Sequence, residues 1–425
     1  MDPDVGRRPL ADKRPWLIAA LATAVAVVVF VAVLAALGMR PPGRPPLLGV
    51  LEADPTYLAQ DNHAGIRFAT LNLSWAKWEP RPGRTDARYR AAVVAQANTY
   101  RAAGWKVAVD IGLQQPPGWA AAGRGGRLVD QYGTTSSTAD FEFSQRARDV
   151  AGRYVSDVVH SMGHIDDYRV GLSENGETLY PDTATNQWWA FAPQAQGSAA
   201  GRPRGVGVTP LPGWVPGGST WKGKEVTISQ VRSWDDWYFG AMVNAHAWEI
   251  SSYRAAGYRG QLELVMPGTG ALPEPYDQRL AGDLAPDGVA DGYCTRNTGA
   301  VRWRFLDALP SLAGLAVDVS SVGDQSGMPQ ANGCQAGDGR VNYLTDPQIY
   351  AWSDARWLTF LAGRHRLPIL GENPGNTPPA DLPAILGLTK SCHLAALQWA
   401  WDYQLRGGGP TVDVTQLGAA FKAQA

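Results

Sequence analysis

Eight short apolar runs alternate with longer segments of helical periodicity, and this alternation constrains the fold more than any other feature of the chain. The runs are LLGV (47–50), IRFATLNL (66–73), KVAVDIGL (106–113), YRVGL (168–172), LELVM (262–266), LAVDVSS (315–321), PILGE (368–372) and LAALQWAW (394–401). Near-continuous apolar strands between helices are typical of parallel strands covered on both faces. Eight such strand–helix units predict an α/β fold, a closed (β/α)8 TIM barrel over residues 47–425.

A doubly wound open sheet is the competing architecture. That fold normally carries a Gly-rich phosphate-binding turn after an early strand, and the sequence has none. Residues 197–224 are rich in Gly, Pro and Ser, and we interpret them as an excursion from the loop after the fourth strand.

Composition excludes several classes of protein. The 425 residues contain 38 Lys and Arg against 39 Asp and Glu, a net charge of -1. The chain therefore lacks the excess of positive charge that is typical of nucleic-acid-binding proteins. With 45% hydrophobic and 18% charged residues, the chain can bury a large core, which excludes global disorder. The 3 Cys lack zinc-site spacing and the 6 His lack metal-site spacing, so no metal or organic cofactor is implied.

The N-terminal segment is predicted to lie outside the barrel. Residues 16–37 form an uncharged apolar run, long enough to cross a hydrocarbon core of about 30 Å as a transmembrane helix. Basic residues gather before this run, which predicts a cytoplasmic tail over 1–15 and an extracytoplasmic body anchored in the cell membrane by a single span. A cleaved signal peptide is the alternative. Residues 38–46 form a Pro-rich linker.

Two carboxylates stand where the chemistry of a barrel is expected. In this fold the active site lies at the C-terminal ends of the strands. Glu177 follows the fourth strand and Glu372 ends the seventh, while Glu174 is a rival for the first position. Cleavage of a glycosidic bond needs one carboxyl group to protonate the leaving oxygen and another to attack, or to activate water. Apolar sugar faces stack on Trp, of which the chain has 17.

The same strand ends supply candidate groups for binding an oligo- or polysaccharide. These are Trp75, Asp110, Trp119, Glu174, Asn175, Tyr180, Asn373, Trp399 and Asp402. For Trp399, packing in the barrel core is the competing interpretation, and Asp110 and Asp402 could equally serve in loop hydrogen bonds.

Three segments resemble glycoside hydrolase family 42, the β-galactosidase-like barrels. GIRFATLNLSWAKWEPRPGRTD (65–86) is similar to that family's second strand and the Trp and Glu-Pro-x-x-Gly turn that follow it. PPGW (116–119), with an Asp-x-x-Gly step at 130–133, is similar to the next block. ILGENPG (369–375) resembles the seventh-strand segment that carries the nucleophile, which implies that role for Glu372.

The fourth strand resembles a second group. VGLSENGETLYP (170–181) is similar to β-amylases, whose acid residue follows a Gly and precedes Tyr-Pro, and this implies that Glu177 is the acid. Family 42 enzymes retain the anomeric configuration and β-amylases invert it; we expect retention, because the likeness to family 42 is longer. Two positions depart from family 42: Gly176 stands where that family usually has Asn before the acid, and Ala69 where it tends to have Arg.

The sequence therefore predicts a membrane-anchored exported glycoside hydrolase. A catalytically inactive barrel that binds cell-envelope glycan is the alternative. Outside the membrane two cysteines can pair. We expect a disulfide between Cys294 and Cys334, with Cys392 free and buried.

Overall fold

The computed structural model describes residues 45–424, except 124, 182–186, 198–200, 283, 285–296, 325–331, 374 and 408. The chain divides into two compact units, Met1–Pro45 and Pro46–Ala425. The predicted tail (1–15) and membrane helix (16–37) lie outside the described residues, as does most of the predicted linker (38–46). Within the part of the chain that is described, no helix is both long enough and apolar enough to cross a membrane.

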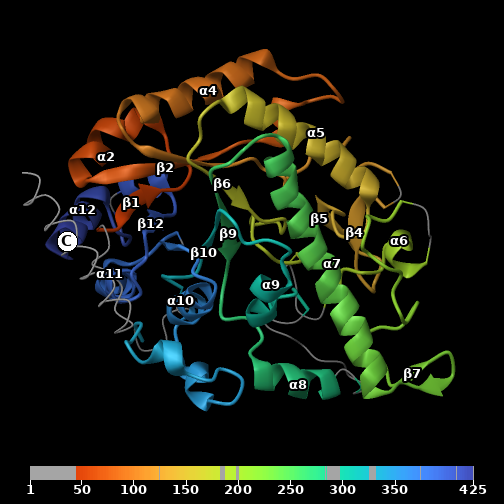
Figure 1. Cartoon of the computed structure of the whole chain (residues 1–425). Helices are drawn as coiled ribbons and strands as arrows, with labels where there is room; N and C mark the ends of the chain where they lie inside the picture. Colours follow the sequence, from red (N-terminus) through yellow and green to blue (C-terminus); the bar gives the residue numbers. More distant parts are fainter. Residues whose placement is uncertain are drawn as a thin grey trace, which may run out of the picture. The chain divides into compact units, whose positions relative to one another are not determined.

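The described strands of the main sheet form a closed barrel (Figure 1). In chain order they are β1 (Leu47–Val50), β2 (Ile66–Asn72), β3 (Lys106–Asp110), β6 (Asp167–Val170), β9 (Gln261–Met266), β10 (Leu315–Val319), β11 (Ile369–Asn373) and β12 (Ala396–Trp399). Every pair is parallel, and β1 closes the barrel by pairing with both β2 and β12. The predicted (β/α)8 barrel is confirmed, and all eight apolar runs are its strands.

Helices cover the outside of the barrel (Figure 1). The longer ones are α2 (Leu58–Ala64), α4 (Ala87–Ala102), α5 (Gln145–Met162), α7 (Ile228–Ala255), α8 (Pro273–Gly282), α9 (Arg302–Ala308), α10 (Asp354–Arg364), α11 (Leu382–Ser391) and α12 (Val414–Gln424). Side-chain caps fix where several of them begin: Asp86 for α4, Ser144 for α5, and a Thr227–Gln230 capping box for α7.

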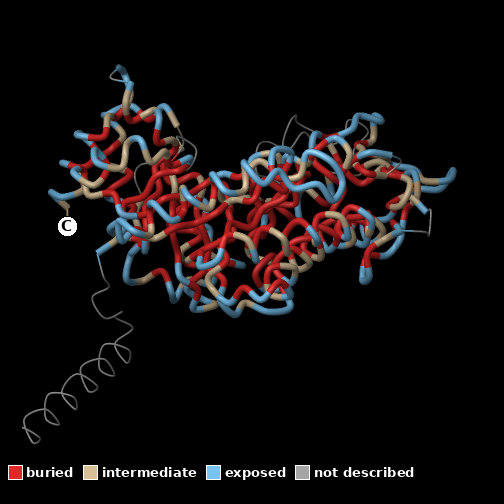
Figure 2. The backbone as a smooth tube through the Cα atoms, turned by 90° about the horizontal axis from the view of Figure 1, so that it is seen from above, coloured by how far each residue is buried: buried red, intermediate tan, exposed pale blue. Residues whose placement is uncertain are grey.

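Short elements lie in the loops between strands and helices. They are α3 (Trp75–Trp78), α6 (Pro193–Gln196), the β4 (Arg127–Val129) and β5 (Thr135–Ala139) hairpin, and the β7 (Thr220–Trp221) and β8 (Lys224–Glu225) hairpin. The second hairpin belongs to the predicted excursion at 197–224, which falls between β6 and α7. Figure 2 shows buried backbone through the centre of the body and exposed segments around its margin.

The interior of the barrel contains both apolar and polar side chains. One apolar cluster, drawn from five strands, consists of Phe68, Ala108, Ala316, Leu370 and Ala396. The Thr70 hydroxyl donates a hydrogen bond to the Gln398 side chain, although β2 and β12 are not neighbours. These two side chains therefore meet inside the barrel, and alternation along each strand then fixes which residues point inward.

The predicted disulfide is wrong in its pairing. Cys334, in the loop after β10, is bonded to Cys392 at the end of α11, with their Cα atoms 4.8 Å apart. Cys294 lies outside the described residues. The loop after β10 runs close to the end of α11, because a Cβ added at Gly333 would stand 2.3 Å from the Ser391 hydroxyl oxygen. Cys392 is buried as expected, but it is buried as a disulfide partner.

Candidate active site

Glu177 lies in a tight loop that follows β6. Its side chain is almost buried, and its Oε1 accepts a hydrogen bond of 2.9 Å from the Ser320 hydroxyl. The loop closes on itself, because the backbone carbonyl of Glu177 accepts bonds from the backbone N–H groups of Leu172 and Ser173. The Ser173 hydroxyl in turn accepts a 3.2 Å bond from the Glu177 N–H. The carboxyl group is thus held by a loop with its own hydrogen bonds.

Arg302 fastens this loop to the end of β9. Its guanidinium is fully buried and donates to the carbonyl of Thr178 at 3.1 Å, to the Thr178 hydroxyl at 3.2 Å and to the carbonyl of Pro267 at 2.6 Å. The Thr178 N–H also donates to the carbonyl of Val265. A planar guanidinium with several fixed donors restrains direction as well as distance, so Glu177 is presented from a rigid support.

Glu372 is the penultimate residue of β11 and forms an ion pair inside the barrel. The Nη2 atom of Arg169 lies 2.7 Å from its Oε2. Arg169 comes from β6, which is separated from β11 by β9 and β10, so the guanidinium reaches across the interior. Burial raises the pKa of Glu372, whereas the ion pair with Arg169 acts to lower it.

The two carboxyl groups open at the same end of the barrel. Ser320, which binds Glu177, directly follows β10. β10 pairs with β11 so that Val319 lies beside Gly371, the residue before Glu372. All strands are parallel, so this is the C-terminal end, where barrels of this type build their sites.

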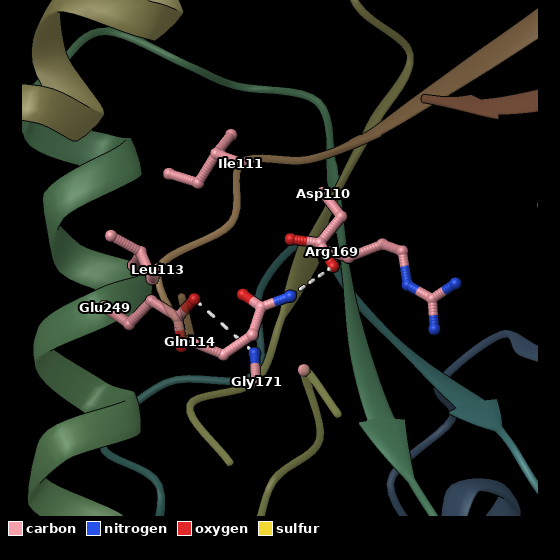
Figure 3. A pocket seen from close by; sticks show the side chains of 8 residues that line it. Asp110, Ile111, Leu113, Gln114, Arg169, Gly171 and Glu249 are labelled. Atoms are coloured by element: carbon pink, nitrogen blue, oxygen red, sulfur yellow. Dashed lines mark hydrogen bonds between the residues drawn. The ribbon is translucent and has the colours of Figure 1, made fainter. Parts of the chain in front are cut away.

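A small pocket with both polar and apolar lining adjoins the ends of β3 and β6 (Figure 3). Asp110 accepts hydrogen bonds from the Gln114 side chain at 2.9 Å and from the Gly112 N–H at 2.8 Å. Glu249, which comes from α7, accepts a bond of 3.4 Å from the Gly171 N–H. Burial raises the pKa of Glu249 well above its usual value. Asp110, predicted as a binding residue, is therefore at the mouth but already engaged in loop hydrogen bonds.

The departure from family 42 at Gly176 has a structural reason. Its φ is +74°, a conformation that disfavours side chains. An added Cβ would also stand only 3.1 Å from Asp110 Oδ2 and from the Gln114 amide nitrogen. A side chain here would require Asp110 or Gln114 to shift by a few tenths of an ångström, and the polar groups beside Gly176 come from the end of β3 and the loop that follows it.

Three aromatic residues predicted to bind substrate are buried. Trp75 stacks on Tyr154 with ring centroids 4.7 Å apart. The Tyr180 hydroxyl donates to the carbonyl of Tyr238, and the two rings stack. Trp399 points toward the helix layer, because its neighbour Gln398 points inward. In this structure the three rings pack the core, in place of the ligand contacts expected of them.

Two polar candidates are also structural. The Asn373 side chain is fully buried, donates to the Thr377 hydroxyl at 2.8 Å and accepts from the Ala400 N–H at 3.2 Å. Asp402 is fully buried as well, accepts from the Asp54 N–H and pairs with Arg406. The carboxamide of Asn373 and the carboxylate of Asp402 each hold a loop in place beside the mouth of the barrel.

The remaining binding candidates are at least partly exposed. Asn175 is exposed and Glu174 half-buried, in the loop that carries Glu177. Trp119 is half-buried, donates to the carbonyl of Glu79 at 3.0 Å and meets Trp75 edge-on. These three side chains remain candidates for contact with a ligand at the mouth.

Sequence reasoning missed an aromatic pair after β12. Trp401 is half-buried and stacks on Tyr403, whose side chain is 53% exposed, with the rings 10° from parallel. The signal was available as a run of aromatic residues, WAWDY, that continues past the strand end. It also missed Arg169, Glu263 and Asp318, charged residues within apolar strands.

Known proteins resemble this chain in structure but do not match it in sequence. No family model and no curated protein sequence matches the chain. Among solved structures it is similar to the catalytic domain of a β-amylase from Paenibacillus polymyxa, with TM-score 0.55 and 12% identity over 89% of this chain and 98% of that one. It is similar to a β-galactosidase from the psychrophilic Marinomonas ef1, also with TM-score 0.55 and 12% identity over 89% of this chain.

The chain spans 59% of the length of that β-galactosidase. At such identities the likeness shows a common fold. The resemblance to glycoside hydrolase barrels is thus confirmed at the level of the barrel. The two proteins are of the two kinds that the motifs resembled, a β-amylase and a β-galactosidase.

Proposed function

We propose that this protein is a glycoside hydrolase that cleaves O-glycosidic bonds at the C-terminal mouth of its barrel. The observation that carries the proposal is the pair of carboxyl groups, Glu177 and Glu372, held at one mouth in two different environments. Two carboxyl groups with distinct surroundings are what hydrolysis of a glycoside requires, because one must donate a proton while the other is ionised.

The partners of each group support a division of roles. Arg169 favours the ionised form of Glu372, as a nucleophile at the anomeric carbon requires. Glu177 binds the Ser320 hydroxyl, which can either donate or accept. Such a partner suits a residue that protonates the leaving oxygen and later takes a proton from water.

We propose retention of anomeric configuration. A retaining enzyme holds its carboxyl groups about 5–5.5 Å apart, whereas an inverting one leaves about 6.5–9.5 Å for a water molecule. Proton NMR of the first anomer released distinguishes the two: the configuration of the substrate supports retention, and the opposite configuration contradicts it.

We also propose that the protein is exported and anchored in the cell membrane by residues 16–37, with a cytoplasmic N-terminus. Their apolar character supports the anchor, and a Cys334–Cys392 disulfide suits an oxidising compartment. Fractionation of cells that express the full chain tests this. Recovery in the membrane fraction is expected, whereas a soluble form that begins near residue 36 would show a cleaved signal.

The decisive experiment for the activity is release of reducing sugar from a panel of cell-envelope oligo- and polysaccharides. The wild type should cleave at least one of them. Glu177→Gln and Glu372→Gln should each lose the activity by at least about 10³-fold, since each removes one half of the acid–nucleophile pair. Glu225→Gln, on the exposed β7–β8 hairpin, is the control and should retain it. A wild type that binds a glycan without cleaving any would favour the inactive-barrel alternative.

A further inference from the structure

A cluster of ionisable side chains lies inside the barrel, below the candidate site. Residues paired across neighbouring parallel strands share a face, as do residues two apart on one strand. By this rule the registers from β3 to β11 turn seven such side chains inward. They are Lys106, Asp110, Asp167, Arg169, Glu263, Asp318 and Glu372. The cluster thus contains five carboxyl groups and two cations.

Arg169 is shared between two of these carboxyl groups. Its Nη2 lies 2.7 Å from Oε2 of Glu372 and 3.7 Å from Oδ2 of Asp318. The Asp318 side chain is fully buried, and within the described part of the chain its oxygens accept no hydrogen bond. Asp318 pairs in register with Leu370, so it lies one inward-facing step below Glu372. The second cation, Lys106, is paired with Asp167.

The cluster therefore has fewer cations than carboxyl groups. An ionised carboxylate buried without a cation or hydrogen bond is costly, so the surplus groups retain their protons. Burial raises the pKa of Glu263 well above its usual value, and the neighbouring Asp167 adds to that effect. Burial, together with the negative charge of Glu372, raises the pKa of Asp318 to about 7, against the effect of Arg169.

We propose that Asp318 is a positioning residue for Glu372: it holds the proton of the pair and so leaves the guanidinium of Arg169 directed at an ionised Glu372. This role rests on the proposed function, in which Glu372 is the nucleophile. The shorter contact of Arg169 favours negative charge on Glu372 and the proton on Asp318. When Asp318 also ionises, the guanidinium is divided between two anions and its hold on Glu372 weakens.

Other charged groups also face this pair and act in the same titration. They come from β3, β6, β9 and the loop after β10, and they are Lys106, Asp110, Asp167, Arg169, Glu263 and Asp324. Arg169 is the only one of them in an ion pair with both Asp318 and Glu372 within the described residues. Asp318 is therefore the carboxyl group that shares a guanidinium with Glu372.

Carbon-13 NMR of the side-chain carboxyl groups tests the proposal without substrate. In the wild-type protein the Glu372 signal, assigned with Glu372→Gln, should titrate and show a second step near pH 7, where Asp318 ionises. In Asp318→Asn the second step should be lost, whereas the main titration of Glu372 should stay in place, because Asp318 is neutral over the pH range in which Glu372 ionises. Glu263→Gln is the matched control, because it removes an equally buried carboxyl group that faces Asp167. The control should keep the second step in the Glu372 signal.

The outcomes separate this proposal from the proposed function. A wild-type Glu372 signal without a step near pH 7, or a step near pH 7 that persists in Asp318→Asn, overturns the role of Asp318 even if the enzyme cleaves glycans. The wild-type measurement decides the matter if the variant does not fold. If the titrations behave as expected but no glycan is cleaved, the coupling stands and the assigned activity fails. With an active substrate, Asp318→Asn should change the pH dependence of kcat/KM more than KM at a single pH.

Discussion

The Ser320 hydroxyl lies 2.9 Å from Oε1 of Glu177 and joins two parts of the site that are 143 residues apart in the chain. Ser320 leaves β10 beside the end of β11, so its contact sets the position of Glu177 relative to the strand that carries Glu372. The position of the proposed acid is therefore fixed by the barrel as well as by its own loop.

Removal of this hydroxyl should weaken catalysis more than folding. We expect Ser320→Ala to lower kcat/KM about tenfold, because a hydrogen bond to an ionisable group contributes about 1.5 kcal/mol. Ser320→Thr keeps the hydroxyl and should retain most of the activity. Steady-state kinetics on a cleaved glycan measures both. An alanine variant with unchanged kcat/KM would mean that Ser320 does not position the acid.

Arg302 should affect catalysis through the loop that it holds in place. Lysine has a charge but not the planar fork that reaches Thr178 and Pro267, so we expect Arg302→Lys to lower kcat at least tenfold. Hydrogen exchange at residues 171–178 should accelerate. Arg304→Lys is the matched control, since this nearby arginine pairs with the half-exposed Asp236 and, among the described residues, forms no hydrogen bond with the loop. Equal effects of the two substitutions would contradict a specific role for Arg302.

The barrel could be predicted because its signal is local and repeated. A strand covered on both faces has to be apolar along its whole length, so eight such runs can be recognised one at a time. Their order follows from chain order in this architecture, and no long-range information is needed.

The site could be predicted only in part, because the direction of a side chain depends on register. Trp399 stands at a strand end but points outward, since Gln398 points inward. Arg169 and Glu372 are 203 residues apart, and only closure of the barrel brings their charges together. The cysteine pairing failed for the same reason: it depends on which loop packs against α11.

Reduction of the Cys334–Cys392 bond should destabilise the body. The sequence separation of 58 residues corresponds to about 4 kcal/mol of lost loop-closure entropy in the unfolded chain. We expect Cys334→Ser and Cys392→Ser to lower the free energy of unfolding by similar amounts, and reductant to have no further effect on either. Denaturant titration with and without reductant measures this. Cys294→Ser should remain sensitive to reductant. Loss of that sensitivity would instead support a disulfide between Cys294 and Cys334.

The buried carboxyl group of Asp318 should make the stability of the protein fall as pH rises. Burial, with the negative charge of Glu372 adding to it, raises the pKa of this group in the folded state to about 7, from 3.8 as its ordinary value. A carboxyl group with a raised folded-state pKa stabilises the fold fully below its unfolded-state pKa, and that stabilisation is lost as pH rises through the folded-state value. The window therefore runs from about pH 4 to about pH 7.

Asp318→Asn replaces this group by a neutral one of similar shape, so it should remove that pH dependence. Relative to wild type, the variant should gain up to about 4 kcal/mol in free energy of unfolding between pH 4 and pH 7, as 1.36 kcal/mol per pKa unit implies. Urea titrations at several pH values measure the difference. Thr70→Val is the control, because it alters a buried polar contact in the same barrel without removing a titratable group. Its difference from wild type should stay constant with pH, and an equally constant difference for Asp318→Asn would show that Asp318 keeps an ordinary pKa in the folded protein.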